Sequence, residues 1–426
     1  MAARSILHVA GSAEWAGGEV YLLQLAQALD RERFRLSVVA PSPGPLVGRL
    51  QGMGIPVFVV PIADHLLSPR ALFALARLFR AERPHLVQSH GARSTFYTRL
   101  AARLAGVARN LSTVHNSLYD YPVSPARRFL YLALDRLTAP LADTIICVAE
   151  SLARDLIDRS RIPARKVVVI QNGVDLTIFQ PDHGDGQKIR REFSLGTLPV
   201  VGMIGRMTPQ KNHSDFLKAV AEVRRSYPEV RALIVGDGPL RPEIEREAVQ
   251  LGLWGVCRFA GVRQDVVDCY AAMDIVVLSS VSEGFPYVVL EALAMAKPLV
   301  ATSVNGVPEI VDDRLTGLLV PPRDSKALAD AILSLLRDPE WARGLGQAGR
   351  KLVEGRFSLE RMIHRLEDLY QQEGRVPTTS PSSLGGGPAP LPNLPPGITP
   401  AKPAFEKIKR PPGPPPPGPG RPVAHE

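Results

Sequence analysis

The chain is poor in cysteine. Its 426 residues contain three, Cys147, Cys257 and Cys269, and each lies within an apolar segment. This number excludes a disulfide-stabilised scaffold, and the apolar surroundings predict buried thiols in a reducing compartment. Long apolar runs are also missing, because no stretch approaches the about 20 residues of a membrane-spanning helix. The chain begins with a strand-like run rather than with a signal-peptide core, so we expect a cytoplasmic location.

Metal-binding patterns are missing as well. The sequence has no Asp-x-Asp pair and no histidine and cysteine cluster at the spacing of metal ligands, so we expect no bound divalent metal. Basic residues outnumber acidic ones by 51 to 42, but aromatic residues, 6% of the chain, are not interleaved with them. A nucleic-acid-binding surface usually combines the two, and we therefore expect no nucleic acid as a partner.

The net charge of +9 is distributed unevenly. Residues 1–175 carry 21 basic and 13 acidic side chains, residues 176–374 carry 24 and 27, and residues 375–426 carry 6 and 2. Between Arg80 and Arg136 nine arginines stand against three acids. This pattern suits peripheral contact with an anionic membrane surface, at the inner face of the cell membrane. The alternative is an arginine-rich surface that is simply solvated.

Proline is concentrated at the end of the chain. Residues 375–426 hold 17 of the 40 prolines, four of them in a row from Pro414, and almost no large apolar residues. Such a segment cannot bury enough apolar surface to offset the entropy lost on ordering, so we predict a disordered basic tail with polyproline stretches. A docking site for a proline-recognition module is the alternative for this tail.

The rest of the chain alternates short β-branched runs with amphipathic stretches. The runs lie at residues 6–10, 36–40, 57–61, 86–89, 111–115, 144–149 and 167–171, and, after a break at 172–199, at 200–204, 232–235, 256–259, 275–278 and 299–301. Runs that are apolar on both faces and joined by helices predict parallel sheets covered on two sides. Two such series predict an α/β protein with two doubly wound, Rossmann-like domains that face each other across a cleft.

Ligands of such sheets bind at the carboxyl ends of the strands, so the residues directly after each strand are the candidates for chemistry. After residues 275–278 comes Glu283, then Gly284, Phe285 and Pro286, with Glu291 eight residues beyond Glu283. Proline suits the first position of a helix, and eight residues in helical geometry place two side chains within about 80°. Both carboxylates can then accept hydroxyl groups of one ligand, while amides near Gly284 favour an anion or a hydroxyl.

Two cations follow the strand at 200–204. Arg206, directly after Gly205, and Lys211 suit a diphosphate, because Arg forks two phosphate oxygens and Lys supplies a mobile charge. Alone, this pair is equally typical of a surface loop. The turn at residues 236–239, Gly-Asp-Gly-Pro, lacks the pattern of a dinucleotide-binding or phosphate-binding loop and predicts no more than a turn.

The first half offers glycines and histidines at strand ends. Gly17 and Gly18 directly precede a predicted helix, where a ligand oxygen can approach backbone amides; a flexible loop is the alternative. His90 and His115 end two consecutive strands and are expected to face the cleft. His115 can hydrogen-bond a sugar hydroxyl or a phosphate, and a satisfied structural histidine is the alternative for each.

Taken together, residues 4–374 resemble the retaining, nucleotide-sugar-dependent glycosyltransferases of family 4, group 1, which have the two-domain GT-B architecture. The most specific motif is Ser-Glu-Gly-Phe-Pro-x4-Glu-Ala at residues 282–292. It is supported by Gly-Arg-x4-Lys at 205–211, Gly-Asp-Gly-Pro at 236–239, Asn-Gly-Val-Asp at 172–175, Gly-Gly-Glu at 17–19 and Thr-Val-His-Asn at 113–116. Pro286 departs from the glycine that is frequent at this position of the family, which removes one amide.

The resemblance implies a division of the chain and a donor. Residues 1–172 would bind the acceptor, 173–356 the nucleotide-sugar, and 357–374 would form a helix that returns to the first domain, before the tail at 375–426. The donor would be UDP- or GDP-linked and would need no metal or other cofactor. The expected acceptors are a glycan or a lipid-linked sugar of cell-envelope polysaccharide, lipopolysaccharide or glycolipid synthesis.

The resemblance also implies a role for each site residue. Arg206 and Lys211 would bind the donor diphosphate and stabilise the departing nucleotide, and Glu291 would hold the ribose hydroxyls. Glu283, with amides near Gly284 and Phe285, would bind the transferred sugar, and His115 would contact that sugar from across the cleft. Gly205 would let the backbone approach the donor, and Gly17 and Gly18 would approach the donor phosphates or the acceptor. Transfer would retain the anomeric configuration by front-side attack, without Glu283 as a nucleophile.

Two other functions compete with this interpretation. A nucleotide-sugar 2-epimerase would also bind a sugar nucleotide between two such domains, but no cluster of acids suited to epimerisation stands out. A non-catalytic, sugar-nucleotide-binding scaffold could use the proline-rich tail. The presence of Arg206, Lys211, Glu283 and Glu291 together argues against lost catalysis.

Overall fold

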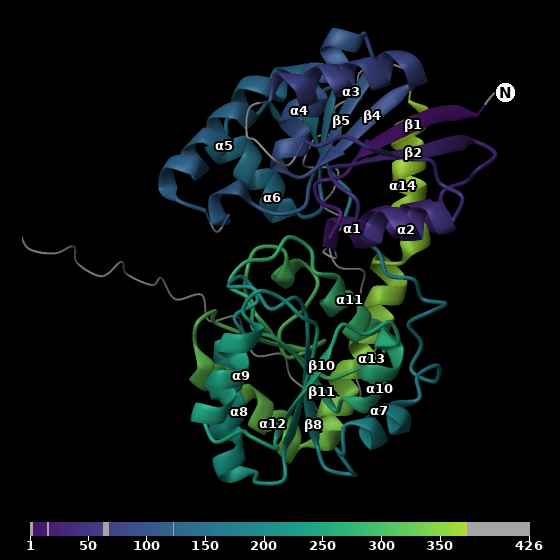
Figure 1. Ribbon diagram of the computed structural model, residues 1–426. Coiled ribbons are helices and arrows are strands. Elements are labelled where there is room, and N and C mark those ends of the chain that lie inside the picture. Colours follow the sequence, from purple (N-terminus) through teal and green to yellow (C-terminus); the bar gives the residue numbers. More distant parts are fainter. Residues whose placement is uncertain (1–2, 15–16, 63–67, 122, 373–426) are drawn as a thin grey trace, which may run out of the picture. The chain divides into compact units, whose positions relative to one another are not determined.

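The computed structural model describes residues 3–14, 17–62, 68–121 and 123–372, and the predicted tail at 375–426 lies outside them. Two parallel sheets form the framework (Figure 1). The first has the order β3-β2-β1-β4-β5-β6-β7, with β1 Arg4–Val9, β2 Phe34–Ala40, β3 Val57–Val59, β4 Leu86–His90, β5 Arg109–Val114, β6 Thr144–Cys147 and β7 Val167–Val169. The second has the order β10-β9-β8-β11-β12-β13, with β8 Val200–Ile204, β9 Arg231–Val235, β10 Cys257–Gly261, β11 Ile275–Leu278, β12 Leu299–Thr302 and β13 Leu318–Val320.

Helices connect the strands of both sheets. We call the first sheet with α1 to α6 the first lobe, and the second sheet with α7 to α13 the second lobe. The helices are α1 Gly17–Ala28, α2 Pro45–Gly52, α3 Pro69–Glu82, α4 Ala92–Ala105, α5 Pro125–Thr138, α6 Glu150–Arg154, α7 Gly186–Glu192, α8 His213–Ser226, α9 Arg241–Gln250, α10 Val266–Ala272, α11 Tyr287–Ala294, α12 Ser325–Arg337, α13 Pro339–Arg356 and α14 Leu359–Gln371. Within the described ranges, no helix is long and apolar enough to cross a membrane.

The first sheet is apolar on both faces because helices cover both. Successive residues of a strand point to opposite faces, and in β1 Leu7 and Val9 belong to the core that includes Leu75 of α3, while Ile6 belongs to the core that includes Leu22 of α1. All five side chains are buried. This is the packing that a run without polar alternation predicts, and it confirms the predicted α/β fold class with two parallel sheets.

The second sheet is built in the same way. In β8, Val201 and Met203 belong to the core that includes Phe216 of α8, whereas Val200 and Ile204 belong to the opposite core. The strand β13 was not predicted from the sequence, because it is three residues long and lies between Gly317 and Pro321, so it carries little pattern of its own.

The last described helix, α14, packs on the first lobe. Its Glu367 accepts a hydrogen bond from Arg33 at 2.7 Å and another from the amide of Asp30 at 3.0 Å, and the guanidinium of Arg4 donates to the carbonyl of Tyr370 at 3.1 Å. These hydrogen bonds therefore join α14 to β1 and to the segment before β2. The domain boundaries at residues 172 and 356 stay a proposal made from the sequence.

Candidate active site

Two loops of the second lobe bring the predicted cation and carboxylate together. Lys211, in the loop after β8, lies with its Nζ 2.5 Å from Oε1 of Glu283, in the loop after β11. Ser280 donates its hydroxyl to the same carboxylate oxygen at 2.6 Å. Glu283 is 5% exposed, so a buried carboxylate and its cation form one unit. A second tie between these loops is the amide of Val281, which donates to the carbonyl of Gln210 at 2.8 Å.

Arg206 differs from Lys211 in its surroundings. Its side chain is exposed, and among the described residues no carboxylate or carbonyl accepts a hydrogen bond from its guanidinium. The stem of Lys211 passes close to Gly205, where a Cβ would lie 3.6 Å from the lysine Cδ. Arg206 and Lys211 therefore lie in the same loop after β8. The Arg206 guanidinium has no partner among the described residues, whereas Lys211 is paired with Glu283.

The loop after β11 presents unpaired amides. Glu283, Gly284 and Phe285 are buried residues, and within the described part of the chain no group accepts a hydrogen bond from their backbone N–H groups. The Phe285 side chain itself belongs to the core, 5.4 Å from the Phe357 ring, and its carbonyl accepts a hydrogen bond from Nδ2 of Asn172 at 2.8 Å. Backbone amides that lack a partner within the protein are available to donate to a ligand, so this loop is suited to bind an oxygen-rich one.

Glu291 lies on α11 and is half-buried. Its Oε2 accepts a hydrogen bond from the Tyr270 hydroxyl at 2.8 Å. Burial raises the pKa of Glu291 to about 7, while the Tyr270 hydrogen bond and the charge of Lys211 act in the opposite direction. Glu291 therefore shares the surroundings of Lys211 with Glu283, and its carboxylate changes charge near neutral pH.

One detail of the helical prediction is wrong. The helix begins at Tyr287, and Pro286 is its N-cap residue with φ −72° and ψ 124°, not its first helical residue. Glu283 thus precedes the helix altogether, and the angular spacing of a helix does not relate it to Glu291. The shared neighbour Lys211 relates the two carboxylates instead.

In the first lobe, His115 directly follows β5 and lies beside the start of α1. A Cβ on Gly18 would lie 3.8 Å from the Cδ2 atom of His115, and Gly17 is exposed with open space around it. Burial lowers the pKa of His115 to about 4, so its imidazole is neutral at neutral pH. The structure thus brings His115, Gly17 and Gly18 to one place.

The two lobes meet at His115. A Cβ on Gly284 would collide with the His115 carbonyl oxygen, so only glycine fits at this contact. Nearby, Oδ2 of Asp120 accepts hydrogen bonds from the Ser282 hydroxyl at 3.2 Å and from Nδ2 of Asn305 at 2.9 Å. The histidine of the first lobe and the Glu283 loop of the second lobe therefore lie at one contact between the lobes.

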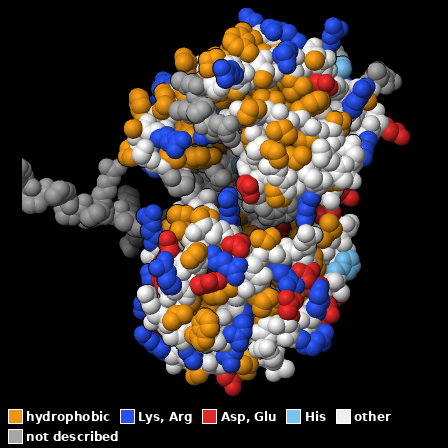
Figure 2. Space-filling view, in the orientation of Figure 1, with side chains coloured by type: hydrophobic (Ala, Val, Ile, Leu, Met, Phe, Trp, Pro, Cys, Tyr) orange, Lys and Arg blue, Asp and Glu red, His pale blue; other side chains and the backbone are white. Residues whose placement is uncertain are grey.

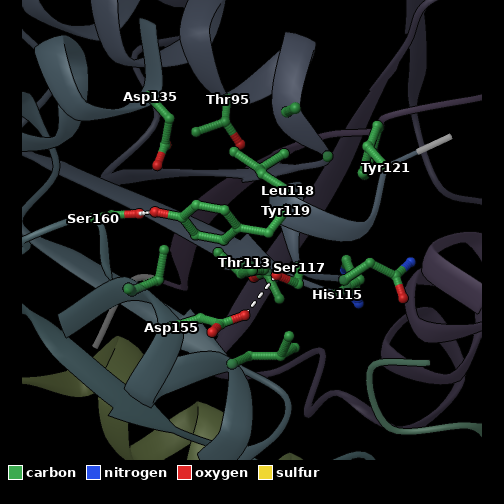
Figure 3. Close-up of a pocket in the computed structure, with 16 residues that line it drawn as sticks. Thr95, Thr113, His115, Ser117, Leu118, Tyr119, Tyr121, Asp135, Asp155 and Ser160 are labelled. Atoms are coloured by element: carbon green, nitrogen blue, oxygen red, sulfur yellow. Dashed lines mark hydrogen bonds between the residues drawn. The ribbon is translucent and has the colours of Figure 1, made fainter. Parts of the chain in front are cut away.

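A small pocket opens beside His115, with a volume of about 60 Å³ (Figure 3). The ring of Tyr119 lies across it, with its hydroxyl 3.1 Å from the Ser160 hydroxyl, and Ser117 donates to Oδ2 of Asp155 at 2.6 Å. Asp135 of α5 also lines the pocket. Arg159 lies over the Tyr119 ring, 3.5 Å from its centroid, and pairs with Asp155, while Asp135 pairs with Arg99. The aromatic and acidic groups of this pocket therefore have partners within the protein.

Sequence reasoning missed several residues of this region. Tyr270, Ser280 and Asp120 hold site residues but carry no motif of their own. His8 is buried next to His90 and Tyr370 is buried next to His8. The available signal was a histidine in the middle of a strand that is otherwise apolar on both faces. In the portion of the chain that is described, no three His, Cys, Asp or Glu side chains are grouped as metal ligands. The absence of a required metal stays an expectation.

Two family models match this chain, one over most of the first lobe and one over most of the second. Residues 15–178 match Glycosyltransferase Family 4, and residues 198–338 match Glycosyl transferases group 1. The alpha-maltose-1-phosphate synthase of Mycolicibacterium smegmatis is 30% identical over 320 residues, which cover 68% of this chain and 80% of that protein. The chain belongs to the family 4, group 1 glycosyltransferases. It is a nucleotide-sugar-dependent glycosyltransferase, as its sequence motifs predict.

Other relatives span nearly the whole length of this glycosyltransferase. A UDP-Gal:alpha-D-GlcNAc-diphosphoundecaprenol alpha-1,3-galactosyltransferase of Escherichia coli is 27% identical over 373 residues, 86% of this chain and 96% of that protein. Among solved structures, Anabaena HepE in complex with UDP and glucose is similar with a TM-score of 0.77 at 23% identity, over 86% of this chain and 99% of the other. Sucrose-phosphate synthase of Thermosynechococcus elongatus gives a TM-score of 0.71 at 23% identity, over 87% and 99%. These structures confirm the GT-B architecture.

Proposed function

We propose that this glycosyltransferase moves a sugar from a UDP- or GDP-linked donor to a lipid-linked sugar or glycan at an anionic membrane surface, with retention of the anomeric configuration. The observation that carries this proposal is the Glu283 loop, where backbone amides without a partner among the described residues adjoin a carboxylate that is paired with Lys211. A cation binds phosphate oxygens, a carboxylate accepts hydrogen bonds from hydroxyls, and free amides donate to sugar or phosphate oxygens. A nucleotide-sugar carries all of these groups.

The donor would lie along the second lobe. The free guanidinium of Arg206 and the Lys211 ammonium bind the diphosphate, and the Glu291 carboxylate accepts the two ribose hydroxyls. Glu283 and the amides of Gly284 and Phe285 hold the transferred sugar, while His115 reaches it from the first lobe. Gly205, Gly17 and Gly18 allow the backbone to approach the ligand. The crystallised relative HepE carries UDP and glucose, which supports a UDP-linked donor.

The reaction breaks the bond between the anomeric carbon and the diphosphate oxygen and forms a bond to an acceptor hydroxyl on the same face of the sugar. The acceptor proton passes to the leaving phosphate oxygen. Negative charge grows on the diphosphate in the transition state, and Arg206 and Lys211 oppose it where it develops. Glu283 is engaged by Lys211 and Ser280, which suits a hydrogen-bonding role toward the sugar better than that of a nucleophile.

A donor-hydrolysis panel tests this proposal. The full-length protein is incubated with UDP-, GDP- and ADP-sugars without acceptor, and release of the nucleoside diphosphate is measured. We expect slow hydrolysis of one class and its loss in Lys211→Ala. Tight binding of a donor without any turnover, with or without a lipid acceptor, would instead favour the non-catalytic scaffold. Release of a free epimerised sugar would favour the epimerase.

The acceptor side of the proposal is supported by α5. This helix turns an apolar stripe outward, in which Phe129 and Leu137 are each 74% exposed and Leu130 is 37% exposed. Ala126 and Ala133 complete the stripe, so its members recur every three or four residues along one exposed face. A helix that buries its apolar face inside the protein shows the reverse pattern, so the α5 stripe is suited to an apolar surface outside the protein.

The charges beside the α5 stripe select the kind of surface. Arg127 and Arg136 on the same helix are exposed, and the helix's one acid, Asp135, is neutralised by Arg99 at 2.7 Å. Figure 2 shows basic side chains among apolar ones over the region of α3 to α5, with few acidic side chains. An anionic lipid surface complements both features. The names of two relatives, which specify diphosphoundecaprenol and phosphatidylinositol acceptors, support a lipid-borne acceptor.

Vesicle sedimentation tests the membrane contact. We expect the protein to sediment with phosphatidylglycerol vesicles but not with phosphatidylcholine vesicles, and Phe129→Glu combined with Leu137→Glu to abolish sedimentation. Trp254→Glu is the matched control, because Trp254 is 82% exposed on the second lobe, away from α5. Equal sedimentation of the wild type with both lipids, or no effect of the α5 variant, would contradict the membrane contact.

A further inference from the structure

Three imidazoles form a chain across three neighbouring strands. His8 lies in β1, His90 ends β4 and His115 follows β5, and these strands are adjacent in the sheet. Nδ1 of His8 lies 2.8 Å from Nε2 of His90, and Nδ1 of His90 lies 3.0 Å from Nε2 of His115. His8 is fully buried and His90 is 2% exposed, so a ligand can meet the chain only at His115. The first two rings therefore have no contact with substrate.

At the buried end of the row of three histidines, the hydrogen bonds of Tyr370 determine which ring nitrogen of His8 carries the proton. The Tyr370 hydroxyl of α14 donates its one hydrogen to Oε1 of Gln88 at 2.7 Å, and Nε2 of Gln88 donates to the Thr113 hydroxyl oxygen at 2.7 Å. The same Tyr370 oxygen lies 3.5 Å from Nε2 of His8. Because the hydroxyl hydrogen is already used, the oxygen faces His8 as an acceptor, and His8 carries its proton on Nε2.

The tautomer of His8 fixes the tautomer of His90, which in turn fixes that of His115. Burial lowers the pKa of His8 to about 3, that of His115 to about 4 and that of His90 well below its ordinary value, so each ring is neutral with one proton. With its proton on Nε2, His8 has a bare Nδ1, which accepts from Nε2–H of His90. His90 then has a bare Nδ1, which accepts from Nε2–H of His115. The remaining ring nitrogen, Nδ1 of His115, is bare, and no described group donates to it.

We propose that His8, His90 and Tyr370 are positioning residues that fix His115 as a hydrogen-bond acceptor, so that its Nδ1 recognises a hydroxyl of the donor sugar and not a phosphate oxygen. A bare nitrogen accepts from a hydroxyl but is repelled by a phosphate oxygen, whereas the opposite tautomer would donate and could bind either. The inference deepens the proposed function and rests on its statement that His115 contacts the transferred sugar. It makes His115 a reader of the sugar.

The tautomer can be measured without any ligand. Full-length protein labelled with ¹⁵N-histidine gives ring-nitrogen signals in which bare and protonated nitrogens are well separated, and His115→Gln assigns those of His115. We expect a protonated Nε2 and a bare Nδ1 in His115. A proton on Nδ1 would overturn the proposal. If no UDP-, GDP- or ADP-sugar is hydrolysed, the proposed function fails separately, because this readout contains no donor.

Variants at the buried end test the coupling to the sugar. In His8→Leu, His90 loses its acceptor, and we expect the KM for the hydrolysed sugar nucleotide to rise about tenfold, the value of one hydrogen bond. The Kd of the nucleoside diphosphate, which has no sugar, should stay unchanged. His8→Asn places an amide oxygen near the lost Nδ1 and should restore most of the affinity. Tyr370→Phe removes one hydroxyl and provides the same test if His8→Leu does not fold.

Two results would contradict the coupling. An unchanged KM in both His8→Leu and Tyr370→Phe would show that the buried end does not act on His115. An equal rise in the nucleoside diphosphate Kd would show a general loss of structure instead of a loss of sugar recognition. A return of affinity in His8→Asn, together with a return of the bare Nδ1 signal of His115, would support the chain, because a structural role alone does not change the tautomer.

Discussion

At the residue scale, Arg206 and Lys211 leave the same strand end but stand in different environments. Arg206 is exposed and has no partner among the residues that the structure describes, whereas the Lys211 side chain is 18% exposed and bonds to a Glu283 side chain that is 7% exposed. Removing an exposed, unpaired cation costs the fold little. Removing Lys211 leaves a buried carboxylate without its cation, which is costly.

We therefore expect both alanine variants to lose turnover but only one to lose stability. Arg206→Ala and Lys211→Ala should each reduce kcat/KM for the donor on the order of 100-fold, the effect of losing one group that opposes developing charge. Urea unfolding should show a change within about 0.5 kcal/mol for Arg206→Ala and a loss of about 1–3 kcal/mol for Lys211→Ala. Arg337→Ala, at an exposed arginine of α12, is the control. Unaltered turnover in both site variants would contradict their assignment.

Glu291 gives a pH dependence. Its folded-state pKa of about 7 lies above its ordinary value of 4.5, because burial disfavours the charged form. Since the folded state then holds a proton that the unfolded state has lost, the stability contributed by this group falls as pH rises from about 4.5 to about 7. The charged carboxylate is also the better hydrogen-bond acceptor for the ribose hydroxyls that we propose Glu291 binds.

We expect the affinity for the nucleoside diphosphate to rise with pH through about 7 in the wild type, following deprotonation of Glu291. In Glu291→Gln the affinity should be lower and should lose this rise. The same substitution should remove the decrease of unfolding free energy over that pH range. Calorimetric titrations and urea unfolding between pH 5.5 and about 8.5 give both quantities. A parallel rise in wild type and Glu291→Gln would assign the titration to another group.

At the element scale, the segment between β11 and α11 is shaped by its neighbours. Gly284 lies against the His115 carbonyl, Asn172 binds the Phe285 carbonyl, and Pro286 caps α11. These contacts hold the unpaired amides in place, so a rigid loop rather than the helix alone presents them to a ligand. A side chain at Gly284 would move this loop and the His115 backbone together.

We expect Gly284→Ala to lose about 1–3 kcal/mol of stability, because the added Cβ overpacks the contact with the His115 carbonyl. Donor hydrolysis should fall more than in a variant that alters only the Glu283 loop or only His115, since Gly284→Ala shifts both. Gly344→Ala is the matched control, because a Cβ there meets open space on an exposed helix position and should stabilise α13 by up to about 1 kcal/mol. Equal behaviour of the two variants would contradict the close contact.

At the scale of the whole described chain, polar contacts join the lobes around the site. Asp120 binds Ser282 and Asn305, and the Glu309 carboxylate accepts hydrogen bonds from the amides of Glu150 and Ser151, at 2.8 Å each. Asp120 is exposed, so it adds little to the stability of either lobe. Its contacts instead favour the arrangement in which His115 and the Glu283 loop are next to each other.

We therefore expect Asp120→Ala to raise the donor KM several-fold while the melting temperature changes by no more than about 2 °C. Asp158→Ala, at another exposed aspartate of the first lobe, should change neither quantity. Steady-state donor hydrolysis and thermal unfolding provide the two measurements. A large fall in melting temperature for Asp120→Ala would mean that this residue stabilises its own lobe rather than the contact between lobes.

The sequence by itself determined the two parallel sheets and the residues after their strands. Runs without polar alternation require sheets covered on both faces, and parallel strands place their carboxyl ends at one edge, so the proximity of Lys211 and Glu283 was predictable. That Arg206, Lys211 and Glu283 bind one ligand stays a prediction. The motif spacing also placed the chain among the glycosyltransferases. The three-residue strand β13 and the N-cap position of Pro286 were not predicted correctly, because short local patterns compete with tertiary contacts.

Only the tertiary structure decided which of these side chains act as units. The ion pair of Lys211 with Glu283 joins residues 72 apart, and the contact of Tyr370 with His8 joins residues 362 apart. Such contacts depend on strand order and on where α14 returns, which local periodicity does not contain. The fold places β1, β4 and β5 side by side and brings Tyr370 next to His8. This arrangement determines which ring nitrogen of His115 carries the proton, and no sequence motif encodes it.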